Sequence, residues 1–239
     1  MKRLKRFYDT VDIQRVSNDQ YKLLLNGKSV KTPLGSHYVL PSEPVASAIA
    51  TEWELQQEFV IPNTMPMNTI LMTNIDLDSN MERSEKLAQI NKYFQTDTLR
   101  FPDLDTESNL SRLQAEKWKP ILDFLVARNV RFTQATGGFA LPPSTEDEIL
   151  EMNDKLLSPY DSLKLTMLET ASKYLKSGST AVGLIDGVIG PEQAFEAANV
   201  EELAQRAEWG LVEGDHDLHD AETRLWLHGI GFLSDLVRV

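Results

Sequence analysis

Two histidines near the carboxyl terminus have the spacing of metal ligands. His216 and His219 lie three residues apart, among the carboxylates of Asp215, Asp217 and Asp220. Two imidazoles on one helix face, completed by a carboxylate, can hold a transition-metal ion that activates water for hydrolysis. The same residues suit the start of a helix, because aspartate caps the first turn and acidic groups favour the positive end of the helix dipole. The segment therefore predicts either a metal site or a capped helix.

Two apolar stripes run along the helix expected over residues 191–210. One stripe consists of Ala197, Val200, Ala204, Ala207 and Leu211. The other, roughly opposite, consists of Phe195, Ala198, Glu202, Gln205 and Trp209. A carboxylate such as that of Glu202 costs free energy among apolar groups unless it is paired. Three roles stay open for Glu202: an internal ion pair or hydrogen bond, an anchor for a donor on another protein, or a general acid with a raised pKa.

Composition and motif searches exclude several classes of function. The chain has 239 residues, no cysteine, a formal net charge of −12 and a pI near 4.8. It has no G-x-x-x-x-G-K-[ST] or G-x-G-x-x-G phosphate loop and no G-x-S-x-G nucleophile motif. The acidic balance argues against nucleic acid, and no apolar run approaches the roughly 18 residues that span a bilayer. We therefore expect no cofactor, no nucleic-acid partner and no membrane insertion.

The negative charge is concentrated near the stripe that contains Glu202. Between Asn199 and Glu222, eight acidic residues accompany a single basic one, Arg206. Charged surfaces of this kind orient a partner protein and raise its association rate. We therefore expect this acidic segment to contribute to binding a partner protein.

The elements that position these residues change type along the chain. Alternating strand-like runs fill the first 40 residues, and Asn26-Gly27 between two of them is typical of a two-residue hairpin. One helix is expected from the N-cap Ser42 to Pro62. Further helices are predicted over 79–95, 109–129, 145–157, 160–177, 179–188, 191–210 and 217–237. Strands followed by helices indicate an α+β fold, with an N-terminal β-rich domain over 1–78 that contains one helix and a C-terminal all-helical bundle over 79–239.

Three methionines occur within the short stretch from Met65 to Met72. Flexible methionine side chains fill irregular gaps in cores, and they also supply adaptable apolar contact surfaces to binding proteins. Both interpretations stay open for this stretch. Trp53 and Trp118 lie within apolar helical patterns and are expected in the core.

Short motifs in a fixed order carry a resemblance to a known family. They are Arg6-Phe7-Tyr8, Asn26–Pro33, Leu40-Pro41-Ser42, Glu52-Trp53 with Gln56, Met65-Pro66-Met67, Tyr93 with Thr96–Leu99, Gln114 with Trp118 and Pro120, Glu202 with Gln205, Trp209-Gly210, and His216-Asp217. Together they resemble the F1-ATPase assembly chaperones that bind the alpha subunit. No single motif is specific, but their order spans nearly the whole chain. Lys28-Ser29 departs from the Arg-Pro that the family often has, which affects the detail of one turn.

The resemblance implies an N-terminal β-rich domain joined to a helical one, and a non-catalytic chaperone without a cofactor. Members bind unassembled alpha subunit and prevent its aggregation until the beta subunit replaces the chaperone. The family's functionally critical glutamate falls on Glu202, and we assign Gln205, Trp209 and Phe195 to the same client-binding surface. The resemblance also implies a mitochondrial matrix protein whose presequence is absent from this chain. We expect a monomer.

Two other classes of function remain as alternatives. The first is a metal-dependent hydrolase that uses His216 and His219. The second is a generic acidic holdase, which would protect aggregating proteins without a dedicated client.

Overall fold

The computed structural model describes residues 4–78, 80–136, 146–210 and 217–238. The chain divides into two compact units, Met1–Glu82 with Phe232–Val239 (the amino-terminal unit) and Arg83–Gly231 (the helical unit). Strands lie in the first and helices fill the second, which confirms the predicted α+β class. The domain boundary near residue 78 stays a prediction. None of the helices within the described ranges combines the length and apolar character needed to cross a bilayer.

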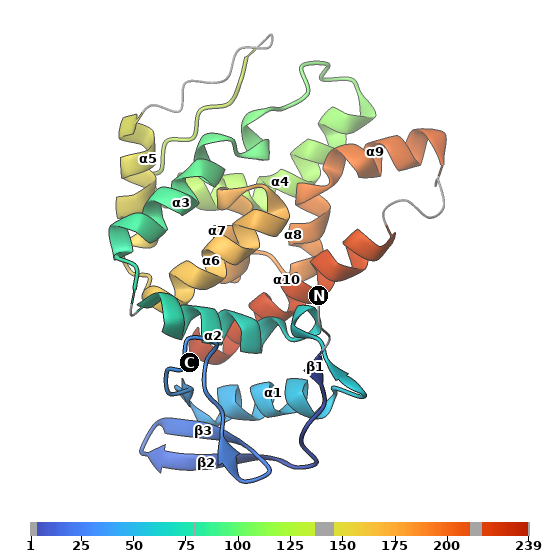
Figure 1. Cartoon of the computed structure of the whole chain (residues 1–239). Helices are drawn as coiled ribbons and strands as arrows, with labels where there is room; N and C mark the ends of the chain where they lie inside the picture. Colours follow the sequence, from blue (N-terminus) through green and yellow to red (C-terminus); the bar gives the residue numbers. More distant parts are fainter. Residues whose placement is uncertain (1–3, 79, 137–145, 211–216, 239) are drawn as a thin grey trace. The chain divides into compact units, whose positions relative to one another are not determined.

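The amino-terminal unit contains two small antiparallel sheets (Figure 1). The larger consists of β2 (Val11–Ser17), β3 (Gln20–Leu25), β4 (Lys28–Ser29) and β5 (Val39–Leu40), with β3 paired to the other three. The smaller pairs β1 (Leu4–Lys5) with β6 (Phe59–Val60). The hairpin predicted at Asn26-Gly27 is confirmed, since both residues have positive φ, 49° and 75°, as a type I′ turn between β3 and β4 requires.

Helix α1 (Glu43–Glu54) packs against strands β2, β3 and β5. It begins after Ser42, as predicted, because the Ser42 hydroxyl accepts a hydrogen bond from the backbone N–H of Val45 at 3.4 Å. The helix ends well before Pro62, since the chain turns after Leu55 and extends into β6. The end predicted at Pro62 was therefore wrong.

A second helix of this unit, α2 (Pro66–Asp78), was not predicted. Pro66 at its first position suits a helix start. The helix buries Asn68 and Asp76 alongside its apolar residues, so the polar and apolar positions do not separate into two faces. That mixed pattern hides the helical period, which is the signal that a sequence search uses.

A buried carboxylate joins α1 to the start of α2. Glu52 accepts hydrogen bonds from the backbone N–H groups of Met67 at 3.0 Å and Asn68 at 2.7 Å. The side-chain oxygen of Asn68 accepts from Trp53 Nε1 at 2.9 Å and from the Tyr38 hydroxyl at 3.1 Å. Glu52 thus satisfies two N–H groups of the first turn of α2 that have no partner within that helix. The motif residues Glu52 and Trp53 are structural.

Burial raises the pKa of Glu52 to about 7, although hydrogen bonds from the backbone N–H groups of Asn68 and Met67 lower it. Because the folded pKa exceeds the ordinary 4.5, the folded state binds more protons than the unfolded state between these two values. This contribution to stability is present below pH 4.5 and is lost as the pH rises through about 7. We therefore expect Glu52 to lower the unfolding free energy by about 2 kcal/mol between pH 5 and 7.5.

Urea unfolding of the wild type and of Glu52→Gln at both pH values measures this contribution. Glutamine does not titrate, so the difference in unfolding free energy between the two proteins isolates residue 52. A difference that stays constant across the pH range would show that the two N–H donors outweigh the effect of burial.

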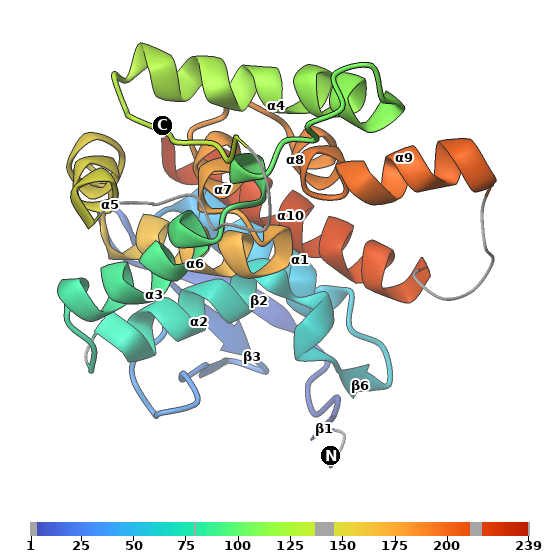
Figure 2. The ribbon, with the colours of Figure 1, turned by 90° about the horizontal axis from the view of Figure 1, so that it is seen from above.

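The helical unit packs around α7 (Gly178–Ile185), of which every residue is buried (Figure 2). Its neighbours are α3 (Arg83–Gln95), α4 (Asn109–Ala127), α6 (Ser162–Leu175) and α8 (Pro191–Ala198). Its other described α-helices are α5 (Glu146–Met152), which a π-helical turn continues over Asn153–Leu157, and α9 (Val200–Trp209). Helix α10 (Asp217–Arg238) belongs to this unit as far as Gly231, and its residues from Phe232 onward belong to the amino-terminal unit. A Cβ atom on Gly178 would lie 2.6 Å from the ring of Phe94, so the contact between α7 and α3 requires glycine.

Candidate functional site

The segment predicted as one helix over 191–210 forms two helices, α8 and α9. Asn199 separates them, with φ −109° and ψ 25°. Its backbone N–H and its side-chain amide both donate to the carbonyl of Phe195, at 3.1 and 2.9 Å. The prediction of a continuous helix was wrong, because the Asn199 side chain competes with the helical hydrogen bonds. The stripe that joined Phe195 to Glu202 is therefore interrupted.

Phe195 lies in the core of the helical unit, with 2% of its surface exposed. The guanidinium carbon of Arg224, on α10, lies 3.8 Å from the centroid of its ring. A cation over an aromatic face is an attractive contact. The buried ring of Phe195 thus packs against the guanidinium of Arg224, a partly exposed residue of α10.

Glu202 lies in the first turn of α9 and pairs with Arg206 one turn later. Its Oε1 accepts a hydrogen bond from Arg206 Nη2 at 2.5 Å. The side chain of Glu202 is 30% exposed, so a protein at the surface of α9 can reach it. The internal ion pair, one of the three roles left open by the sequence, is present, and it leaves the carboxylate accessible.

Ion pairs continue from Glu202 across α9, α10 and α8. We call the six residues the charge ladder: Glu202, Arg206, Asp220, Arg224, Glu192 and His228. Arg206 also donates to Asp220 at 3.1 Å, and Arg224 lies 3.9 Å from Asp220 and donates to Glu192 at 3.2 Å. The far end is the contact of His228 Nε2 with Glu192 at 3.1 Å. The ladder fixes the side chains of three helices in one charged surface.

Two pKa shifts follow from the ladder. The hydrogen bond to Asp220 holds the pKa of Arg206 above its ordinary value, and the pair with Glu202 adds to this effect. The contact with His228, followed by the hydrogen bond from Arg224, lowers the pKa of Glu192. Most of these side chains are partly exposed, so each pair contributes at most about 1 kcal/mol to stability. Asp220 is the most buried residue of the charge ladder, with 10% of its side chain exposed.

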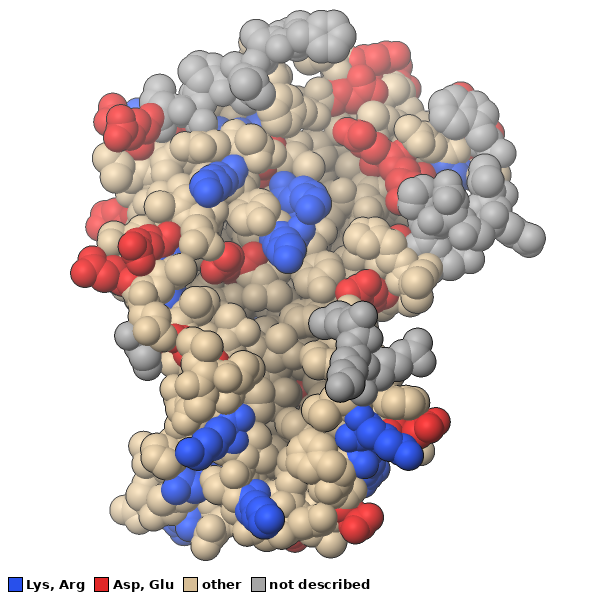
Figure 3. Space-filling view, in the orientation of Figure 1, with Lys and Arg blue, Asp and Glu red and all other residues tan. Residues whose placement is uncertain are grey.

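The other predicted residues of α9 lie near Glu202 along the same helix. Gln205 is exposed, one turn after Glu202. Trp209 is the last residue of α9, and its side chain lies outside what the structure describes. The following residue, Gly210, ends the helix with φ 84°, a conformation that favours glycine. Acidic side chains gather on this part of the surface, at the upper right of Figure 3.

The metal site predicted at His216 and His219 has no support. His216 lies outside the described residues, and His219 is exposed on α10. Asp220, a candidate carboxylate ligand, instead accepts a hydrogen bond from Arg206. Within the described part of the chain, no three His, Asp or Glu side chains are grouped so that they could hold a metal ion.

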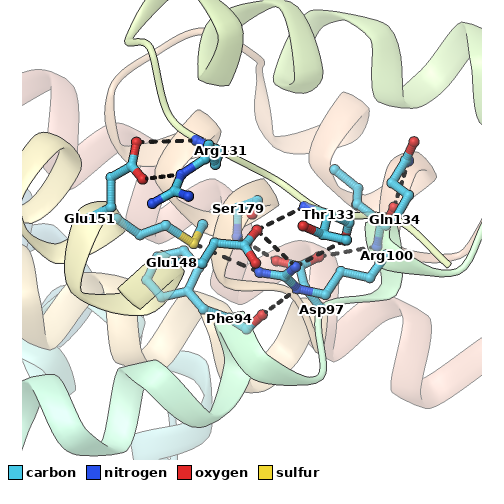
Figure 4. Close-up of polar contacts among 11 residues, drawn as sticks. Phe94, Asp97, Arg100, Arg131, Thr133, Gln134, Glu148, Glu151 and Ser179 are labelled. Carbon is cyan, nitrogen blue, oxygen red and sulfur yellow. Dashed lines mark hydrogen bonds and ion pairs between the residues drawn. The ribbon is translucent and has the colours of Figure 1, made fainter. Parts of the chain in front are cut away.

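A buried ion pair that sequence reasoning missed lies elsewhere in the helical unit (Figure 4). Arg100 Nη1 donates to Glu148 Oε1 at 3.1 Å, and the two side chains are 0% and 3% exposed. Arg100 also donates to the carbonyls of Phe94 at 2.8 Å and Thr133 at 2.9 Å, while its guanidinium lies 4.4 Å from the ring centroid of Phe132. The arginine is occupied by contacts within the chain, so we assign it a structural role.

Asp97 forms a second buried connection, to the start of α7. Its carboxylate accepts hydrogen bonds from Leu99 N at 3.1 Å, Ser177 Oγ at 2.7 Å and Ser179 N at 2.8 Å. Burial raises the pKa of Asp97, and these hydrogen bonds oppose the rise. The only sequence signal was the motif Thr96–Leu99, which contains Asp97 but does not reveal its partners about 80 residues away.

Comparison with known proteins places the chain in a family. A family model for the ATP12 chaperone protein matches residues 5–126, which is just over half of the chain. The chain belongs to the ATP12 chaperone family. Mitochondrial proteins named ATP12 from Schizosaccharomyces pombe and Saccharomyces cerevisiae are 24% and 25% identical to it. These matches cover 92% and 94% of this chain and 79% and 82% of the relatives. The crystal structure of Atp12 from Paracoccus denitrificans is similar with a TM-score of 0.82 and 25% identity, over 98% of this chain and 99% of that one.

The family resemblance expected from the motifs is thereby confirmed. The segment matched to the ATP12 family contains Glu52, Asp97 and Arg100, the centres of the buried polar contacts. Glu202 and the rest of the charge ladder lie beyond that segment, within the part covered by the similarity to the Paracoccus structure.

Proposed function

We propose that this protein is an assembly chaperone of the F1 sector of ATP synthase, which binds unassembled alpha subunit and prevents its aggregation until the beta subunit takes its place. Membership of the ATP12 chaperone family supports an assembly role. The observation that carries the alpha-binding proposal is the position of Glu202, a partly exposed carboxylate that Arg206 fixes on the surface of α9.

The proposal concerns a subunit interface that is exposed to solvent before assembly. An unassembled subunit exposes an apolar surface meant for its neighbour, and such surfaces aggregate. A chaperone has to cover this surface and still be exchanged, which favours a contact with charged groups that set orientation and association rate. Glu202 would accept a hydrogen bond from an arginine or a backbone N–H of the alpha subunit. Exposed Gln205 and the end of α9 at Trp209 would extend the contact, while buried Phe195 would support Arg224.

The Glu202→Lys variant tests this role. We expect it to bind isolated alpha subunit at least about tenfold more weakly and to lose protection against aggregation, because the substitution reverses the charge that the partner recognises. Its unfolding free energy should stay within about 1 kcal/mol of the wild type, since the pair with Arg206 is partly exposed. Light scattering of alpha subunit and urea unfolding of the variant measure the two effects.

Glu201→Lys is the matched control, because Glu201 is an exposed neighbour on the same helix and undergoes the same charge change. It should protect alpha subunit as the wild type does. The proposed role of Glu202 fails if Glu202→Lys still protects alpha subunit, or if both variants lose protection equally. A variant that unfolds would instead support a structural role for the ion pair.

The remaining parts of the proposal follow from the same family. We propose that the protein works without catalysis and without a cofactor, as a monomer in the mitochondrial matrix. The relatives from the two yeasts, which are named as mitochondrial proteins, support the compartment. Sedimentation of the purified protein tests the oligomeric state.

A further inference from the structure

A groove of about 650 Å³ lies within the amino-terminal unit, far along the sequence from the charge ladder. One wall is the chain from Leu25 to Pro33, which contains β4. Leu4 and Phe7 also line the groove, and Met65 and Met72 contribute to its apolar lining. This volume is within the range of sites that hold small molecules or short peptides. Of the methionine stretch, Met65 is 1% exposed, as a core residue is, while Met72 is partly exposed at the groove, so the contact-surface interpretation stays a prediction.

Apolar side chains at the groove are left open to solvent. Phe7 is 60% exposed and Leu4 is 55% exposed. The wall formed by Leu25 to Pro33 is held in place, because Asp76 of α2 accepts hydrogen bonds from the Thr32 hydroxyl at 2.5 Å and from the backbone N–H of Leu34 at 3.2 Å. A fixed wall lowers the entropy lost when a ligand binds.

The charge of the groove is opposite to that of the chain. None of the residues that line it is acidic, although the chain has 36 Asp and Glu residues. Lys28 and Lys31 line it, and both are exposed. Basic side chains gather over the amino-terminal strands in the space-filling view (Figure 3). The groove therefore favours a ligand with apolar groups and a negative charge.

The backbone at the groove suits an extended polypeptide. β4 pairs with β3 on one side only, so within the described strands it is the edge of its sheet. An edge strand presents free N–H and C=O groups with which an extended segment can pair, and alternate side chains of that segment then enter an adjacent pocket. A small apolar acid would use the pocket and the lysines but not this edge.

We propose that the groove binds an extended segment of a partner polypeptide in which apolar side chains flank an aspartate or glutamate. The apolar side chains lie against Leu4, Phe7 and Met72, and the carboxylate pairs with Lys28 and Lys31. The inference goes beyond the proposed function, because it adds a second contact surface in a different unit. Its test involves no ATP synthase subunit.

Fluorescence anisotropy with two labelled peptides tests the proposal on the full chain. The probes are fluorescein-Ser-Leu-Val-Glu-Val-Leu-Ser and its counterpart with lysine in place of glutamate. We expect the glutamate peptide to bind more tightly than the lysine peptide, and its affinity to fall as salt is added. The double substitution Lys28→Glu with Lys31→Glu should weaken the glutamate peptide about tenfold and reverse the preference.

A second variant tests the groove itself rather than its charge. Thr73 is exposed and lines the groove, so Thr73→Trp should fill the space and weaken the glutamate peptide at least about tenfold. The matched controls are Ser47→Trp on the exposed side of α1 and Lys173→Glu on α6, both outside the groove. Neither control should change peptide affinity.

Three results would overturn the proposal. The first is the absence of binding by either peptide to the wild type. The second is binding that Thr73→Trp and the double lysine variant leave unchanged. The third is a concentration-dependent dimer that Thr73→Trp abolishes, which would assign the groove to a second copy of the chain.

Discussion

Replacing Arg100 by methionine is expected to lower the free energy of unfolding by about 3–5 kcal/mol. Arg100 is fully buried, and it donates to Glu148 and to the carbonyls of Phe94 and Thr133. Methionine fills much of the volume but leaves the Glu148 carboxylate buried without the guanidinium that pairs with it, although the backbone N–H of Thr133 still donates to it at 2.7 Å. An uncompensated buried charge is among the largest single costs in a folded protein.

Urea unfolding followed by circular dichroism measures this loss. Arg131→Met is the matched control, because Arg131 also pairs with a glutamate of α5, Glu151, but its side chain is 72% exposed. We expect that variant to lose at most about 1 kcal/mol. The double variant Arg100→Met with Glu148→Met should recover much of the lost unfolding free energy, since it also removes the buried carboxylate that had paired with Arg100. A loss below 1 kcal/mol for Arg100→Met, or additive losses in the double variant, would contradict the assignment.

Replacing Asp97 by alanine is expected to cost about 3 kcal/mol or more. The substitution leaves the backbone N–H groups of Leu99 and Ser179 buried without their acceptor, and each such group costs about 1–3 kcal/mol. Ser179 lies in the first turn of α7, the helix around which its unit packs. The loss should therefore destabilise the whole helical unit rather than one loop.

Asp161→Ala provides the comparison for Asp97. Asp161 also caps a helix, since its carboxylate accepts from the backbone N–H of Lys164 at 2.8 Å, but it is exposed at the start of α6. Water can replace its hydrogen bond, so we expect a loss of about 1 kcal/mol. Denaturant unfolding that shows equal losses for the two aspartates would argue against a special role for the buried one.

Local signals predicted much of the fold. The Asn26-Gly27 turn and the Ser42 cap depend on neighbouring residues alone, and the structure confirms both. One element that depends on contacts distant in sequence was missed. Helix α2 contains Asn68 and Asp76 at buried positions because Trp53, Tyr38 and Thr32 satisfy them.

The candidate site shows the same division between local and distant contacts. Glu202 and Arg206 lie four residues apart within one helix, and a sequence can reveal a pair with this spacing. The extension to Asp220, and the placement of Arg224 over Phe195, depend on how α8, α9 and α10 pack. Periodicity alone could not predict the interruption at Asn199, because an asparagine in a helical pattern is compatible with a continuous helix.

The proposed function requires that this protein recognise unassembled alpha subunit specifically. Isolated alpha subunit, isolated beta subunit and citrate synthase, each allowed to aggregate with and without one equivalent of the protein, test it directly by light scattering. We expect suppression of alpha-subunit aggregation alone, together with a one-to-one complex in sedimentation. Equal protection of all three proteins would show a generic holdase, and no protection of the alpha subunit would contradict the proposed function.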